Sequence, residues 1–135
     1  TGVQLEAGTT ASDFEFLPYD VNLQRCQRYC YSETAGDGNH AYCNGFWGNT
    51  TRLITIKELP VSMRTAPSLT TTGNYQVNGS SNVTITSFAL SDNNINDINA
   101  IQIRADVSSG GTTGQGGMIR NSNDATATFI LSSEL

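Results

Sequence analysis

Charged residues are scarce in this chain, and cations are the scarcest among them. Only 14% of the 135 residues are charged, with seven Lys and Arg against twelve Asp and Glu, which gives a formal net charge of -5. Binding a nucleic-acid backbone requires clustered cations that displace counterions from the phosphates. The composition therefore argues against nucleic acid as a partner.

Long apolar runs are also missing. No stretch approaches the roughly 20 apolar residues needed to cross a bilayer. Residues 1–10 have neither the basic start nor the apolar segment of a signal peptide. We therefore expect no membrane insertion of the chain as given.

Residues that could carry catalysis are few. The one histidine, His40, lies in a polar stretch beside glycines and is expected to be solvated, and there is no nucleophile elbow or helical His pair. Asp13 and Glu15, or the acidic residues in and beside the Asn-rich segment 91–99, could offer oxygen ligands to Ca²⁺. Turn-forming Asn and Asp account for the second group without an ion. We predict no enzyme activity, no metal site and no cofactor.

Small and turn-forming residues are abundant instead. Thr, Ser, Asn and Gly make up 56 of the 135 residues. This mixture favours strands joined by many turns, because helices draw on Ala, Leu, Glu and Lys. A chain of this length buries roughly two-thirds of its unfolded surface around one core. We therefore expect a single domain over residues 1–135.

Alternation of apolar and polar residues predicts the strands. It is clearest over 51–58, 81–90 and 100–107, with a register change or bulge near Ser87. A final strand is expected over about 124–131. Seven to nine closely spaced strands predict an all-β fold, an antiparallel β-sandwich of jelly-roll type.

The first part of the chain is less regular. Residues 1–6 alternate as a strand, and residues 1–16 are expected to complete or link to an upstream domain of a longer chain. After Pro18, apolar residues recur at three- to four-residue spacing. This spacing predicts one short helix near residues 19–29, with Asp20 or Asn22 available to cap its first turn.

Aromatic residues gather in one short stretch. Tyr42, Phe46 and Trp47 lie within six positions of a predicted strand over 40–47, which is interrupted by the Asn44-Gly45 dipeptide, a favoured type I′ hairpin turn. Sugar rings stack on aromatic planes while amides bind their hydroxyls, so Tyr42, Asn44, Phe46 and Trp47 form a candidate glycan site. The alternative is that the aromatic side chains fill the core. The sequence leaves both interpretations open.

Three separated pieces of the chain have a distinctive wording. They read GVQLEAG with FEFLPYDVNLQRCQRYC (2–8 and 14–30), LPVSMRTAPSLT (59–70), and TGQGGMIR with SSEL (113–120 and 132–135). In this order they resemble the C-terminal domain of bacteriophage and prophage tail fibres and tail spikes. Members of that family typically carry a GVQLE strand, a CQRYY or CQRYF motif, a PVPMR segment, a Gly-rich loop and a final AEL.

The resemblance implies a structural protein of the virion, outside the cell, in the distal part of a tail fibre. It also implies a homotrimer that contacts a host cell-surface polysaccharide or receptor. Three weak sites on one rigid head gain affinity through effective concentration. The family leaves open whether this domain binds the receptor or only trimerises. The alternative function is a monomeric carbohydrate-binding module of a larger secreted or phage enzyme.

The cysteines depart from the family pattern. Cys30 stands where the family has an aromatic residue after CQRY, and Cys43 is additional. A disulfide between them would close a 14-residue loop and contribute on the order of 3 kcal/mol, leaving Cys26 as a free buried thiol. The alternative is that all three are small hydrophobic residues. Their spacing matches no common zinc pattern.

Overall fold

The computed structural model describes residues 17–91 and 98–133, which form one helix and nine strands. The predictions for residues 1–16 lie outside the described residues. In chain order the elements are α1 (Tyr19–Gln27), β1 (Cys30–Thr34), β2 (Ala41–Asn49), β3 (Arg52–Glu58), β4 (Ser68–Thr72), β5 (Tyr75–Asn78), β6 (Asn82–Leu90), β7 (Ala100–Val107), β8 (Gly116–Asn121) and β9 (Thr128–Ser132).

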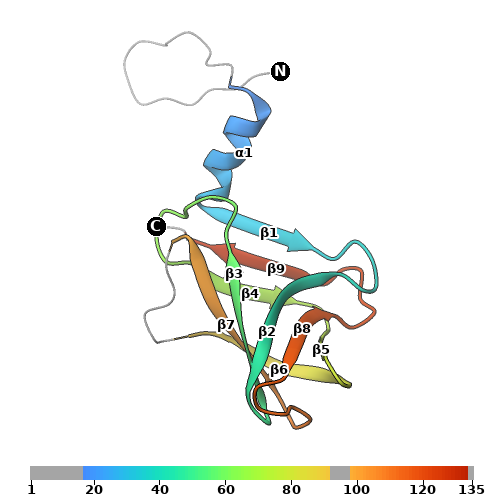
Figure 1. Cartoon of the computed structure of the whole chain (residues 1–135). Coiled ribbons are helices and arrows are strands. Elements are labelled where there is room, and N and C mark those ends of the chain that lie inside the picture. The colour runs from blue at the N-terminus through green and yellow to red at the C-terminus, as the bar shows by residue number, and fades with distance from the viewer. Residues whose placement is uncertain (1–16, 92–97, 134–135) are drawn as a thin grey trace, which may run out of the picture.

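Every strand pair is antiparallel, which confirms the all-β prediction, but the architecture is not a sandwich. Six strands form a closed barrel in the order β2-β3-β7-β6-β5-β8 (Figure 1). The barrel closes because β8 pairs with β2 on one side and with β5 on the other, so Ile119 lies opposite both Cys43 and Val77. Each of the six strands therefore pairs with a neighbour on both sides over at least part of its length.

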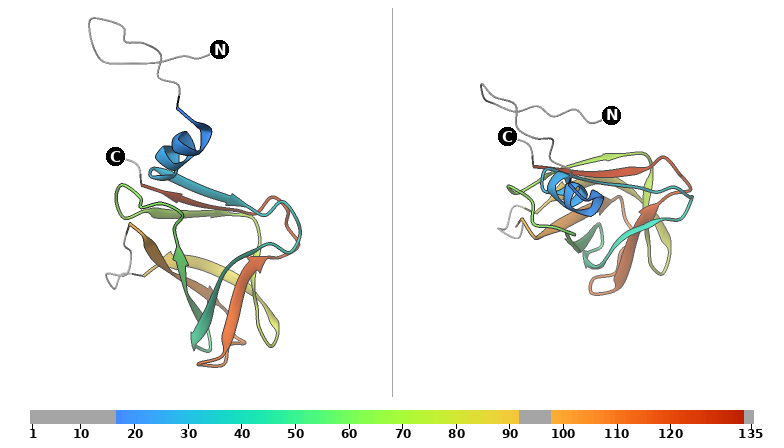
Figure 2. Two further views of the ribbon diagram at one scale, coloured as in Figure 1. Left: turned by 45° about the horizontal axis from the view of Figure 1, so that its top comes forward. Right: turned by 90° about the horizontal axis from the view of Figure 1, so that it is seen from above.

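The remaining strands form a second, smaller sheet. It has the order β1-β9-β4 and lies across one end of the barrel, with α1 extending beyond it (Figure 2). In β9, buried Phe129 and Leu131 alternate with the partly exposed Thr128, Ile130 and Ser132. The buried residues of this central strand therefore join the sheet to the barrel.

Two groups of side chains make up the core. Aromatic residues from four strands meet between the barrel and the small sheet, where the Phe129 ring centroid lies 5.7 Å from that of Tyr42 and 6.0 Å from that of Phe88. Inside the barrel the filling is aliphatic. Its fully buried members are Leu53, Val77, Ile101, Ile103, Ala105 and Ile119.

Four predicted strands are confirmed as β3, β6, β7 and β9. In β7 the expected inward residues Ile101, Ile103, Ala105 and Val107 are all buried. The last strand begins later than expected, because the Ala127 N–H donates to the Asp124 carbonyl in a turn before it.

The predicted bulge in β6 is also confirmed. Ile85 lies opposite Val107 while Ser87 lies opposite Asp106, so Thr86 is an extra residue without a partner of its own. A bulge turns residues on either side of it onto the same face. Ile85 and Phe88, three positions apart, are consequently both packed against the core.

The helix prediction is confirmed, but its cap is different. Pro18 occupies the N-cap, and no side chain caps the helix, so neither Asp20 nor Asn22 has that role. The helix begins two residues earlier than a cap at Asp20 would allow. Asp20 lies in the first turn, where its charge interacts favourably with the helix dipole.

The predicted turn at Asn44-Gly45 is wrong. The strand β2 continues through both residues to Asn49, and the chain reverses at residues 50–51. The reason for glycine is close packing, because a Cβ at Gly45 would lie 2.1 Å from the main-chain oxygen of Ile54 on β3. The aromatic residues around this dipeptide favour a strand and override its turn preference.

Replacing Gly45 by alanine is expected to lower the free energy of unfolding by about 1–3 kcal/mol, because β3 must move to admit the methyl group. Gly116→Ala on β8 is the matched control, since its nearest atom would be 3.9 Å away. Urea denaturation of both variants measures the difference. Equal effects would show that close approach of β3 is not what requires glycine at position 45.

Candidate functional site

The aromatic site predicted on β2 is not assembled at the surface. Tyr42 and Trp47 are only 5% and 3% exposed, whereas Phe46 is 52% exposed and Asn44 is also exposed. The core-filling alternative therefore holds for two of the three aromatic residues. Asn44 and Phe46 remain on the outer surface without the two other rings.

Burial of Trp47 depends on the Gly-rich loop. The main-chain N–H of Trp47 donates to the Gln115 carbonyl at 2.8 Å, and the main-chain N–H of Gly114 donates to the Trp47 carbonyl at 2.8 Å. A Cβ at Gly111 would lie 2.2 Å from the indole ring. The loop between β7 and β8 thus covers the indole, and Gly111 allows its main chain to lie against the ring.

The predicted disulfide is not formed. All three cysteines are free, and Cys26 is exposed rather than buried. Cys30 begins β1 in the small sheet, while Cys43 lies in β2 of the barrel and donates to the Thr55 hydroxyl at 3.4 Å. Burial raises the pKa of the Cys43 thiol, which keeps it protonated at neutral pH.

A cluster of charged groups lies between β1 and the barrel. The Lys57 ammonium donates to Glu33 Oε2 at 2.6 Å, His40 Nε2 lies 2.8 Å from Glu33 Oε1, and the Tyr31 hydroxyl donates to Glu33 at 3.2 Å. The prediction of a solvated histidine is therefore wrong, because the turn before β2 brings His40 to Glu33. No sequence spacing signals this pairing, since three separate elements supply the groups.

Glu33 is held in its charged form. Burial alone would raise its pKa, but the hydrogen bonds from Lys57, His40 and Tyr31, with the charge of Lys57, outweigh burial and lower the pKa. Side-chain exposure is only 19% for Glu33 and 10% for Lys57. The cluster has little access to solvent, so its first role is to fix β1 to the barrel.

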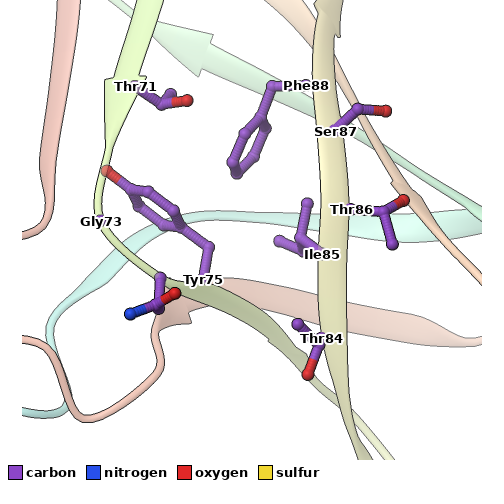
Figure 3. A pocket seen from close by; sticks show the side chains of 9 residues that line it. Thr71, Gly73, Tyr75, Thr84, Ile85, Thr86, Ser87 and Phe88 are labelled. Carbon is purple, nitrogen blue, oxygen red and sulfur yellow. The ribbon is translucent and has the colours of Figure 1, made fainter.

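A pocket of about 150 Å³ opens where the barrel meets the small sheet. Its lining comes from Thr71 at the end of β4, residues 73–75 entering β5, and residues 84–88 of β6. Figure 3 shows that Tyr75, Ile85 and Phe88 turn toward one another, while Thr86 and Ser87 point to the other side of β6. The interior thus combines two rings and an aliphatic side chain with the polar groups of the β4–β5 turn.

Strand divergence creates this pocket. β5 pairs with β6 only from Asn78↔Asn82 to Gln76↔Thr84, and from Ile85 onward β6 pairs with β7 alone among the described strands. β4 runs nearby but pairs with β9. Main-chain groups on this edge of β6 therefore face the pocket without a strand partner in the described part of the chain.

The Tyr75 hydroxyl in this region is buried and meets no partner at hydrogen-bond geometry, although it lies close enough to the Tyr42 hydroxyl to interact with it electrostatically. The neighbouring Tyr42 hydroxyl donates to the Ala127 carbonyl at 2.8 Å. Burial, and then the proximity of Tyr42, raise the pKa of Tyr75, so the phenol stays neutral. A buried, unsatisfied polar group is unusual in a folded protein and marks a position where a polar ligand atom would be favoured.

Helix α1 is the second unusual surface. None of its residues is buried, and Tyr19 is 81% and Leu23 41% exposed. Tyr19, Leu23 and Cys26 recur at i, i+4 and i+7, which places them on one face. This exposed face, formed by Tyr19, Leu23 and Cys26, is called the helix stripe below.

Among the described residues, main-chain hydrogen bonds tie the base of α1 to the body. The Arg28 carbonyl accepts from the Arg64 N–H at 2.8 Å and from the Ser133 hydroxyl at 2.8 Å, and the Tyr29 carbonyl accepts from the Ser133 N–H at 2.8 Å. The rest of the helix extends past the small sheet (Figure 2). The helix therefore has a defined direction but lacks a packing partner along its stripe within the described chain.

Comparisons with protein-family models, curated proteins and solved structures found no match. Within residues 17–91 and 98–133, no helix has the length and apolar character needed to span a membrane. No group of three His, Cys, Asp or Glu side chains in those ranges is arranged to hold a metal ion. Function is consequently inferred from the pocket and the helix stripe.

Proposed function

We propose that this chain is the distal domain of a phage tail fibre, which assembles as a homotrimer through α1 and attaches to glycans on the host surface. The observation that carries the proposal is a nine-residue helix with no buried residue. Isolated helices shorter than about 12–15 residues are marginal in water, so such a helix requires a packing partner. Further copies of the same helix would supply it.

The helix stripe has the chemistry of a helix–helix contact. Apolar residues at i, i+4 and i+7 form the seam along which helices pair, and Tyr19 and Leu23 are the largest exposed apolar residues of α1. The opposite face carries Gln24, Arg25 and Arg28, beside Val61 of the body. The tail-fibre wording of the sequence supports three copies, since the stripe alone fits bundles of several sizes.

Attachment to the host is supported by the shape of the body. Turns at residues 50–51, 79–81 and 108–115 gather at the end of the barrel away from α1 (Figure 1). Loops on a rigid scaffold tolerate variation and carry recognition in many binding proteins. Assembly at one end and recognition on the barrel would thus occupy separate surfaces.

Native mass spectrometry of the whole chain tests the assembly, with three times 14.5 kDa as the expected mass. Leu23→Gln keeps helix propensity but removes one apolar side chain per copy, each worth about 1.5–3 kcal/mol when buried. We expect this variant to be monomeric at micromolar concentration. Gln24→Ala, on the other face, is the control and should remain trimeric.

A wild-type chain that is monomeric at the same concentration would contradict the trimer. If that monomer bound glycans, the alternative of a monomeric carbohydrate-binding module would replace it. A trimer unaffected by Leu23→Gln would place the subunit contact away from the helix stripe.

A further inference from the structure

The pocket between β4, β5 and β6 has a lining without charge. Its side chains are hydroxyl, amide, aliphatic and aromatic, and the raised pKa of Tyr75 keeps its phenol neutral. An anionic ligand would meet no cation in this lining, and the carboxylate that a cationic ligand would meet beside it is that of Asp124. The Asp124 carboxylate already accepts two hydrogen bonds, from the Asn74 main-chain N–H at 3.0 Å and from the Thr126 hydroxyl at 2.7 Å.

The ligand of this pocket must offer both apolar and polar groups. Ile85 and the Phe88 ring offer an apolar surface, and the Phe88 and Tyr75 rings meet edge to face at 5.1 Å. Thr71, Asn74 and the Tyr75 hydroxyl offer polar groups around it (Figure 3). A purely apolar ligand would bury these polar groups without compensation, which costs free energy.

The volume restricts the ligand further. About 150 Å³ corresponds to roughly five water molecules and lies well below the roughly 300–1,000 Å³ of pockets for drug-sized ligands. One small ring fits, while the units attached to it would remain in solvent. A single ring with C–H faces and several hydroxyl groups meets the conditions of size, polarity and neutrality together.

We propose that this pocket binds one neutral pyranose unit of a host-surface glycan, with Phe88 and Ile85 against the ring and Thr71, Asn74 and Tyr75 at its hydroxyls. The proposal rests on the proposed function and extends it by naming the site and the ligand class. The unpaired edge of β6 adds fixed main-chain donors and acceptors. Affinity for one unit would be weak, and three copies would raise it through effective concentration.

The test uses NMR titration of the full chain with methyl glycosides of neutral hexoses, N-acetylhexosamines and deoxyhexoses, and with methyl glycosides of sialic acid as the charged probe. At least one neutral glycoside is expected to shift the amide signals of Thr71, Asn74, Tyr75 and residues 84–88. The charged probe is expected to bind at least tenfold more weakly.

Two matched pairs of variants locate the ligand. Thr71→Val removes a hydroxyl inside the pocket, while Thr70→Val makes the same change on the exposed face of β4. Tyr75→Phe removes the hydroxyl without a partner, while Tyr42→Phe removes one that donates to Ala127. Thr71→Val and Tyr75→Phe are each expected to raise the Kd for the glycoside roughly three- to tenfold, and the controls to leave it unchanged.

Folding is monitored in each variant by its thermal midpoint. Tyr75→Phe should not lower the midpoint, because the hydroxyl it removes has no partner, whereas Tyr42→Phe should lower it. Tyr75→Phe is therefore expected to weaken binding without lowering the thermal midpoint. Tyr42→Phe is expected to lower the midpoint without weakening binding. A purely structural role of the pocket would not give that pattern.

Three results would overturn the pocket as a sugar site. The first is a change of amide signals that is confined to the surface around Asn44 and Phe46. The second is an equal change of the Kd in Thr71→Val and Thr70→Val. The third is that no neutral glycoside changes any amide signal. In each case a trimer by mass spectrometry would leave the assembly proposal standing. Conversely, a monomer that binds a neutral glycoside in this pocket would refute the trimer and retain the sugar site.

Discussion

Replacing Trp47 by alanine is expected to lower the free energy of unfolding by about 3–5 kcal/mol, the range for deleting a large buried aromatic side chain. The indole is 3% exposed and lies against Gly111 of the Gly-rich loop and Gly117 of β8. The loop would lose the surface that it covers. Urea denaturation followed by far-UV circular dichroism measures the change, because Trp47 is the only tryptophan and its fluorescence is lost.

Phe46→Ala is the matched control for this experiment. Phe46 is the adjacent residue on the same strand but is 52% exposed, so its removal should cost less than about 1 kcal/mol. A comparable loss of stability in both variants would contradict the assignment of Trp47 to the interior and Phe46 to the surface.

Replacing Lys57 by methionine is expected to have the second largest effect, about 2–3 kcal/mol at neutral pH. Removing one partner of a buried ion pair costs about 3–5 kcal/mol, and the partial exposure of this pair lowers the figure. The variant leaves the Glu33 carboxylate buried with fewer donors. Arg52→Met, in the more exposed pair with Asp106, is the control and should lower the stability far less, because solvent screens this pair.

The penalty for losing Lys57 should depend on pH in a defined direction. In the wild-type chain the pKa of Glu33 is lowered, so its stabilising contribution is present above the unfolded pKa and is lost as the pH falls through the folded one. Without Lys57, the pKa of Glu33 should be higher than in the wild-type chain, because only His40 and Tyr31 then oppose the effect of burial. The difference in unfolding free energy between variant and wild type should therefore be larger at pH 7 than at pH 3. A difference that is constant from pH 3 to pH 7 would show that the charge of Glu33 is not involved.

Much of the barrel was predictable from local pattern. Residues 100–107 alternate strictly and form β7, and the break in alternation near Ser87 predicted the bulge in β6. The strands β4, β5 and β8 were not predicted. SLTTT and GGMIRN lack apolar alternation, and β5 has only four residues, so these segments become strands through their partners rather than through their own composition.

The strands that were not predicted explain why the predicted architecture, a β-sandwich, was wrong. β8 is the strand that closes the barrel by pairing with both β2 and β5. Without it, the remaining alternating strands suggest two facing sheets. Register and closure depend on pairing between distant segments, which a single sequence does not encode locally.

The candidate pocket was beyond the reach of sequence reasoning for a similar reason. Its inner side chains Thr71, Tyr75 and Phe88 come from three strands, two of which were not predicted. The bulge near Ser87 was the one available signal, since bulges often lie next to functional sites. The aromatic stretch on β2 was the clearer sequence pattern for a binding site, but the Tyr42 and Trp47 side chains are buried in the core.

The hydrogen bonds from Ser133 and Arg64 to the base of α1 determine which parts of the domain tolerate substitution. They hold the helix at one pole, next to the end of β9, while the turns at residues 50–51, 79–81 and 108–115 lie at the other pole (Figure 1). Substitutions in those turns can alter the contacted surface without touching the bonds at the helix base. Substitutions at either pole can therefore leave the packing at the other pole unchanged.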